Sequence, residues 1–366
     1  MNTFELNNIR KDADIYNGNI TKHSPVVEVF AAMTKGESLQ RFGKKADVAV
    51  NYIKSLGSRA DNGDFSAVAE LNTIRRFVIE APVMEELKLL GIFGTYENVG
   101  FDETIEREVY RHVGERSREQ ANNGDVVFPA ISKEVYSVPT FTVSGGYQVD
   151  YRRVSLGDMS KENEGLNQVK IDILNNAKAA IIKKVYQAIS DATGIKYVVE
   201  TAGLTKSLVD SALSKVRRYG KPTVVADYAI LSQFTPWAGY VGTINSNTIT
   251  GISRTVMDEI AANGTLSMYN GAILAEMENP YNEYKLNAAG DDFETMLPAG
   301  LGFIIPAGVN TPIKIWTRGN LTSMSGNNVH TGKIETRFDI ECAADVAKGQ
   351  ENRIGILYDT NIGGLD

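Results

Sequence analysis

Residues 333–346 alternate between apolar and polar side chains almost without interruption. The apolar set includes Ile334, Phe338 and Val346, and the positions between them carry mainly charged side chains. Ala343 is the one small apolar residue in the polar set. A period of two predicts a β-strand with one buried face and one wet face. At ~3.3 Å per residue this strand would be ~45 Å long, more than twice the usual length.

A second long pattern occupies residues 160–191, where apolar side chains recur every three or four positions. These positions are Leu166, Val169, Ile173, Ala177, Ile181, Val185 and Ala188. The spacing predicts an amphipathic helix, again ~45 Å long at ~1.5 Å per residue. We expect this helix to pack along the apolar face of strand 333–346. The resulting elongated slab suits a building block better than an enclosed active site.

The first sixty residues predict an arm with short helices. Ser24 followed by Pro25 is typical of a helix start, because proline tolerates the first helical position. A second helical piece is expected to end near Gly57. A third begins at Asp64 and is either interrupted or ended by Pro82, with two further turns to follow.

Residues 96–152 have strand propensity, but neither face of the predicted strand 104–113 is consistently apolar. Pro129 and Pro139 confine the returning segments to an edge or an irregular ribbon. Such a ribbon cannot build a core of its own, so we expect a neighbouring copy of the chain to hold it. Its interleaved charges suggest the candidate inter-subunit contacts Glu106, Arg107, Glu108, Arg111, Arg116 and Arg118.

Residues 197–310 predict a compact α/β segment of short helices and strands. It includes a helix over 252–262 and a pair of short strands around Asn270-Gly271. Short apolar strands are expected at 300–306, 311–317 and 353–358.

Composition narrows the class of protein further. The chain has 366 residues, 43% hydrophobic and 23% charged, and a net charge of −7, which argues against tight general nucleic-acid binding. No apolar run is long enough for a membrane span, and the polar N-terminus does not resemble a signal peptide. Cys342 is the only cysteine and belongs to the apolar set of strand 333–346, where a small buried hydrophobe is expected.

Patterns that carry catalytic chemistry are absent from the sequence. The three histidines, His23, His112 and His330, are far apart, and none belongs to a zinc-binding motif. Nucleophile-elbow, Walker A and dinucleotide fingerprints do not occur. Asp102-Glu103 and Asp291-Asp292 are interpreted as solvated turns rather than cation sites. We therefore predict no catalytic residue, no cofactor, no metal site and no enzymatic activity.

The order of these parts resembles the major capsid protein of tailed bacteriophages, the Hong-Kong-ninety-seven fold. The most similar passage is residues 297–321, LPAGLGFIIPAGVNTPIKIWTRGNL. The resemblance implies an α+β fold with an N-terminal arm, an extended E-loop ribbon, a long spine helix, a peripheral domain with a long β-strand, and an α/β axial domain. The implied boundaries are 1–62 for the arm, 63–95, 153–196 and 311–366 for the peripheral domain, 96–152 for the E-loop and 197–310 for the axial domain.

The resemblance also implies the function. Copies would assemble as hexamers and pentamers into an icosahedral shell around packaged double-stranded DNA, without sequence-specific DNA binding and without a membrane. Scaffold, portal and decoration proteins are the further partners it suggests, and the site of action would be the virion, after synthesis in the host bacterial cytoplasm. Some members of the family cross-link an E-loop lysine covalently; Lys133 is the only lysine in that region, and we do not expect the bond here.

Two other functions remain open. An encapsulin-type cellular nanocompartment would have the same fold, but the long arm and the large axial segment favour the viral shell. The third possible function is that of an α/β enzyme with an added hairpin that has no catalytic role. A deep pocket with convergent polar groups in residues 197–310 would support it.

Overall fold

The computed structural model describes residues 24–114, 117, 119, 122, 124, 128, 130–149, 156, 160–237, 260, 262–287, 290–307, 311–328 and 333–364. The chain divides into two compact units. The first comprises Met1–Leu90, Phe141–Lys178 and Thr317–Cys342, and the second comprises Gly91–Thr140, Ala179–Trp316 and Ala343–Asp366. Helix α6 (Ser160–Ser190) and strands β12 (Ile313–Asn328) and β13 (Lys333–Val346) each contribute residues to both units.

Three helices near the start of the chain pack together in the first unit: α2 (Pro25–Thr34), α3 (Lys44–Asp61) and α4 (Phe65–Leu89). A short 3-10 turn, η1 (Leu39–Phe42), joins α2 to α3. The predicted start at Ser24-Pro25 is confirmed, and the second helix runs four residues past Gly57.

Pro82 lies inside α4 and does not end it, so the expected break is wrong. A proline in a helix removes one backbone hydrogen bond and usually kinks or ends the helix. Here the apolar side chains on both sides of it are buried, among them Ile74, Ile79, Val83 and Leu87. Packing of that face holds the helix together across the proline.

Strand β13 has the predicted bounds, and it pairs antiparallel with β4 (Phe141–Val149), from Ile334 opposite Val149 to Cys342 opposite Phe141. Gly145 lies opposite Phe338. A Cβ on Gly145 would lie 2.8 Å from Cγ1 of Ile173, so α6 approaches this strand pair as closely as a glycine allows.

Phe338 is fully buried, and its ring stacks on that of Tyr147 with 6.3 Å between centroids. Residues directly opposite in an antiparallel pair share a face, so Phe338 lies on the face that α6 covers. The predicted packing of the long helix against the apolar face of this strand is confirmed.

A second long strand was missed. β12 extends to Asn328, whereas the sequence predicted a strand only as far as Thr317. The four strands of this sheet follow the order β1 (Thr95–Val99), β12, β13, β4. Residues 318–328 lack an apolar alternation of their own. This part of β12 lies beside β13, where Arg318 pairs with Glu341 and the hydroxyl of Thr322 donates to the carbonyl oxygen of Asp339.

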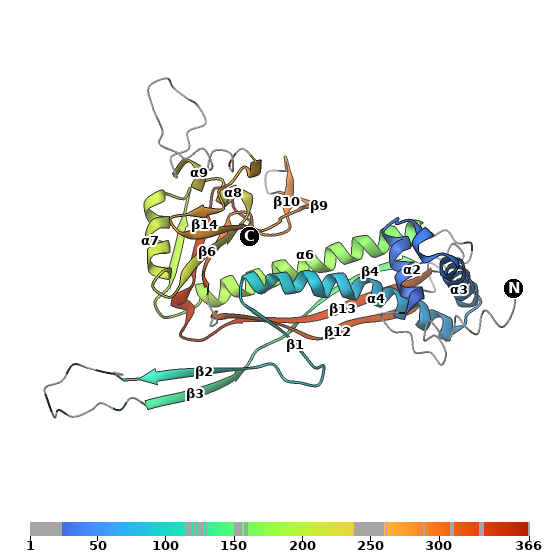
Figure 1. The fold of residues 1–366 in the computed structure, drawn as a ribbon, viewed down its shortest axis with the longest axis horizontal. Coiled ribbons are helices and arrows are strands. Elements are labelled where there is room, and N and C mark those ends of the chain that lie inside the picture. Colours follow the sequence, from blue (N-terminus) through green and yellow to red (C-terminus); the bar gives the residue numbers. More distant parts are fainter. Residues whose placement is uncertain are drawn as a thin grey trace, which may run out of the picture. The chain divides into compact units, whose positions relative to one another are not determined.

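The second unit contains a six-stranded mixed sheet. Its order is β5 (Tyr197–Thr201), β14 (Gly355–Asp359), β11 (Leu301–Ala307), β6 (Lys221–Ala226), β8 (Ala272–Glu276) and β7 (Met268–Tyr269). Helix α7 (Lys206–Val216) lies against this sheet, and two single-turn helices follow β6 (Figure 1). They are α8 (Tyr228–Leu231) and α9 (Phe234–Trp237).

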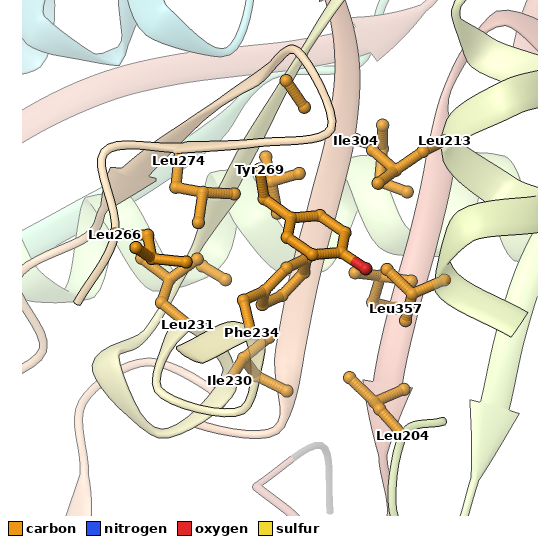
Figure 2. Close-up of a cluster of buried hydrophobic side chains, with 14 of the residues drawn as sticks. Leu204, Leu213, Ile230, Leu231, Phe234, Leu266, Tyr269, Leu274, Ile304 and Leu357 are labelled. Carbon is orange, nitrogen blue, oxygen red and sulfur yellow. The ribbon is translucent and has the colours of Figure 1, made fainter. Parts of the chain in front are cut away.

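The core of this unit gathers side chains from the sheet and all three of these helices (Figure 2). Tyr269 packs edge-on against Phe234 with 5.1 Å between ring centroids. The expected strand pair is confirmed as β7 and β8, joined by Asn270 and Gly271 at positive φ. The hairpin of β9 (Tyr281–Leu286) and β10 (Phe293–Thr295) was not predicted, and the helix expected over 252–262 lies largely outside the described residues.

Replacing Phe338 by alanine should lower the free energy of unfolding by about 3–5 kcal/mol, because the deletion leaves a cavity between β13 and α6. Urea unfolding followed by circular dichroism measures the change. Phe293→Ala is the control, since that side chain is 43% exposed. Equal losses from the two variants would contradict the assigned packing.

Asp64 caps α4 by accepting hydrogen bonds from the backbone N–H groups of Ser66 and Ala67. The hydroxyl of Ser66, then the guanidinium of Arg59, lower the pKa of Asp64 from 3.8 to about 2. A lowered pKa means that the charged cap stabilises the fold above pH 3.8, and this contribution is lost as the pH falls towards 2.

Asp64→Asn should therefore be less stable than the unchanged chain at pH 7, and the difference should shrink as the pH falls from about 4 towards 2. Thermal unfolding at a series of pH values measures it. A difference that does not vary with pH would show that the charge of Asp64 does not contribute.

Candidate inter-subunit surface

The segment with the candidate contacts forms a two-stranded ribbon of β2 (Glu106–Val113) and β3 (Ala130–Ser137), which run side by side (Figure 1). The strands are antiparallel, from Glu106 opposite Ser137 to Val113 opposite Ala130. Because opposite residues share a face, this register fixes which side chains lie together. The outer face carries Glu106, Glu108, Tyr110, Ile131, Lys133 and Val135, and the inner face carries Arg107, Val109, Arg111, Glu134 and Tyr136.

The inner face is anchored at the base of the ribbon. Arg107 is 9% exposed, and its guanidinium donates to the carbonyl oxygen of Asp345 at 2.8 Å and to that of Pro312 at 2.6 Å. It also lies 3.3 Å from Oδ2 of Asp345, and the hydroxyl of Tyr136 donates to the same oxygen at 2.7 Å. Arg107 and Tyr136 are opposite each other in the register, so both strands hold one carboxylate. We call Arg107, Tyr136 and Asp345 the base clamp.

Burial is the largest cause of the raised pKa values of Asp345 and Tyr136 in the base clamp. Burial raises the pKa of Asp345 above its usual value, although the hydrogen bond from Tyr136 and the charge of Arg107 act in the opposite direction. Burial, and then the hydrogen bond to Asp345, raise the pKa of the Tyr136 phenol strongly. The phenol therefore remains a hydrogen-bond donor across the physiological range.

A small hydrophobic core lies beneath the base clamp. It consists of Ile105, Val138, Trp316 and Ala343, with Val99 and Tyr136 packed against it. The Arg107 guanidinium carbon lies 5.9 Å from the centre of the Trp316 ring. The ribbon has no core of its own, as expected, but Trp316 and Ala343 of the same chain pack at its base, where a neighbouring copy was expected to hold it. Trp316 belongs to β12, and sequence alone could not show that its side chain packs at the base of the ribbon.

On the outer face of the ribbon, every side chain whose burial the structure describes is exposed. Three apolar side chains lie on it, with exposed fractions of 58% for Tyr110, 64% for Ile131 and 46% for Val135. Beside them Lys133 and Glu108 form an ion pair at 2.6 Å. The hydrogen bond from Lys133 to Glu108 raises the pKa of the amine, which keeps it protonated and a poor nucleophile. Exposed apolar side chains in such a stripe are typical of protein interaction surfaces.

The predicted contact residues have different environments. Glu106 and Glu108 lie on the exposed outer face, and Arg111 is exposed on the inner face. Arg107 is buried against its own chain in the base clamp, because its guanidinium satisfies two backbone carbonyls and one carboxylate there. It is therefore a structural anchor rather than an accessible contact. Arg116 and Arg118 lie outside the described residues.

The apolar stripe on the outer face was missed by sequence reasoning. Tyr110 comes from one strand and Ile131 and Val135 from the other, and their proximity depends on the register of the ribbon. Residues 130–137 carry an alternation of their own, with Ile131, Lys133 and Val135 on one side, which could have indicated this face.

Among the residues that the structure describes, no group of three or more His, Cys, Asp or Glu side chains is placed to hold a metal ion. Cys342 is buried, and burial raises the pKa of its thiol to about 12. In the same part of the chain, no helix is long and apolar enough to cross a membrane.

The profile of one protein family, described as "SPbeta prophage-derived putative capsid protein YonB", matches residues 5–358. The chain belongs to this capsid-protein family. The prediction of a phage capsid protein is thereby confirmed, and the family indicates a structural rather than a catalytic protein. A comparison with curated protein sequences gives no match.

Solved structures of low sequence identity are also similar. Mycobacterium phage Patience shares 12% identity, covering 86% of this chain and 90% of that one, with a TM-score of 0.46. A structure from Mycobacterium phage Ogopogo shares 11% sequence identity and also has a TM-score of 0.46. The match covers 74% of this chain and 91% of that one. The virus-like particle from Pyrococcus furiosus shares 10% sequence identity, with a TM-score of 0.44. The match covers 76% of this chain and 97% of that one. The assignment rests on the family match.

Replacing Asp345 by asparagine should loosen the ribbon, because Arg107 is left in a buried position without its counter-charge. We expect a loss of about 2–4 kcal/mol and faster amide hydrogen exchange in β2 and β3. Hydrogen exchange read by mass spectrometry measures both the site and the size of the effect. Asp339→Asn is the matched control, since its partner Arg337 is exposed and the pair should contribute less than about 1 kcal/mol. Unchanged exchange in β2 and β3 would contradict the anchoring role.

Proposed function

We propose that the chain is the major capsid protein of a tailed bacteriophage with the Hong-Kong-ninety-seven type of fold. Its copies assemble as hexamers and pentamers into an icosahedral shell that encloses packaged double-stranded DNA. The membership of a prophage-derived capsid family supports this function and favours it over a cellular nanocompartment or an α/β enzyme.

The ribbon of β2 and β3 supports the proposal most directly. Its base is anchored on the chain's own core, whereas its outer face exposes Tyr110, Ile131 and Val135. A two-stranded ribbon is marginal in water unless its apolar side chains are covered. Each copy therefore presents an anchored strand pair whose free face a neighbouring copy covers.

The parts of the chain are proposed to have the roles implied by the family resemblance. Residues 96–152 are the E-loop, α6 is the spine helix, 197–310 form the axial domain and 1–62 the arm. The peripheral domain comprises 63–95, 153–196 and 311–366. Glu106 and Glu108, beside the apolar stripe of the outer face, and Arg111, on the inner face, remain the proposed charged contacts, and Arg116 and Arg118 remain proposed with them.

The net charge of −7 suits a container for DNA, because a negative shell does not adhere to its polyanionic contents. Individual contacts between copies need only be weak, since every copy makes many of them at once. Scaffold, portal and decoration proteins are proposed as further partners, with the virion as the place of action.

The test is assembly of the purified protein, observed by negative-stain electron microscopy. The unchanged chain should form closed particles. Ile131→Asp together with Val135→Asp should lower the yield of particles by about tenfold or more, because the charges must be desolvated at every contact.

The control for this double variant is Ile195→Asp with Leu208→Asp, two apolar residues of similar exposure outside the ribbon. Circular dichroism should show that both double variants are folded. Equal particle yields would contradict the role of the outer face, and small soluble oligomers from the unchanged chain would contradict the capsid function itself.

A further inference from the structure

A polar groove with a volume of about 950 Å³ lies between β2 and two other segments of the same unit. One wall is the strand from Arg107 to Val113, and the other consists of Thr311 and Lys314 with the turn 347–350 and Arg353. Five basic side chains line it: Arg107, Arg111, Lys314, Lys348 and Arg353. Among the described residues of the lining, Glu108 is the only acidic one. We call this the basic groove.

Two of the five cations are neutralised by close partners within the chain. Arg107 is held by Asp345 in the base clamp, and Lys314 forms an ion pair with Glu97 at 2.5 Å. The acidic residue of the lining, Glu108, is itself paired with Lys133. These pairs leave Arg111, Lys348 and Arg353 as the cations that determine the charge of the groove.

Two of the three remaining cations, Arg111 and Lys348, share a single carboxylate. Glu134 lies 3.6 Å from Arg111 and 3.8 Å from Lys348, which is longer than the ~2.7–2.9 Å of a strong charged hydrogen bond. Arg353 lies 5.9 Å from the centre of the Tyr219 ring, and no carboxylate of the described residues forms an ion pair with it. The groove therefore retains an excess of about two positive charges in a chain whose net charge is −7.

These cations are positioned by the local fold. Gly349 turns the chain at a φ of +80°, and the Arg111 guanidinium lies about 3.7 Å from where its Cβ would be. The Lys348 amine lies 4.2 Å from the centre of the Tyr136 ring, so the base clamp also helps to place it. Ordered side chains lose less entropy on binding, which favours recognition by these three cations.

We propose that the basic groove binds a carboxylate-bearing segment of a neighbouring copy of this chain. The inference rests on the proposed function, because it assigns one more contact within the same assembly. The groove opens beside the ribbon that is already proposed to lie against a neighbour. Every copy also carries acidic turns, such as Asp102-Glu103 and Asp291-Asp292, whose side chains are exposed.

Charge complementarity favours a protein carboxylate over nucleic acid as the occupant. An excess of about two positive charges can match one or two carboxylates. Tight binding of a nucleic acid requires many phosphate contacts, each of which adds to the salt dependence. An acidic segment repeated on every copy supplies one occupant for each groove.

Zero-length cross-linking tests the proposal directly. Copies labelled with nitrogen-15 are mixed with unlabelled copies before assembly, and the isolated particles are treated with a carbodiimide. This reagent joins an amine to a carboxylate in contact with it, with loss of water. Mass spectrometry of the digest should show Lys348 joined to an Asp or Glu peptide of the other isotope. The pair Lys348–Glu134 within one copy is the internal control, since it gives same-isotope products.

A charge-reversal pair provides a second measurement. Arg111→Glu with Arg353→Glu should raise the protein concentration needed for assembly by about tenfold at low salt, and the effect should shrink as salt screens the charges. Arg218→Glu with Lys221→Glu makes the same change in net charge at exposed positions outside the groove. The control pair should assemble like the unchanged chain.

The outcomes separate this inference from the proposed function. Closed particles in which Lys348 joins only Glu134 would overturn the inference and leave the capsid function standing. A soluble small oligomer in place of particles would overturn both. Binding of a fluorescent single-stranded oligonucleotide that is lost in the Arg111→Glu, Arg353→Glu variant would identify nucleic acid as the occupant and would also overturn the inference.

Discussion

The alternation of strand β13 is the constraint on which both units depend. In the first unit it buries Phe338, Ile340 and Cys342 against the face that α6 covers, while Glu335 and Arg337 stay exposed. In the second unit the same strand supplies Ala343 to the small core beneath the ribbon and Asp345 to the base clamp. A one-residue slip of this strand would exchange its two sets of side chains, so its register with β4 is strongly specified.

The base clamp holds the ribbon in place through Asp345, which belongs to β13. One carboxylate accepts from a guanidinium and a phenol on opposite strands, and the backbone carbonyls of Asp345 and Pro312 satisfy more of the Arg107 donors. Burial of the carboxylate is costly, yet its partners are close and well placed. The base of the inner face is thus fixed to its own chain, and the described side chains of the outer face stay exposed.

The exposed apolar side chains and the excess basic side chains lie on different surfaces in this part of the chain. The outer face presents Tyr110, Ile131 and Val135, whose burial supplies contact energy without direction. The basic groove presents Arg111, Lys348 and Arg353, whose charges favour one partner chemistry and one register. A shell needs both properties, because each contact must be weak enough to correct during assembly and specific enough to repeat.

The sequence by itself determined the long strand 333–346, the long helix, the start of α2 at Pro25, the order of parts that resembles a phage capsid protein and the absence of catalytic motifs. Those features depend on periodicity within one segment, which is local. The tertiary structure decided the rest. Pro82 remains inside α4 because its neighbours are packed, and β12 extends beyond Thr317 beside β13. Arg107 proved to be an anchor because Asp345, 238 residues away in the chain, lies beside it. No local pattern encodes contacts between residues so distant in sequence.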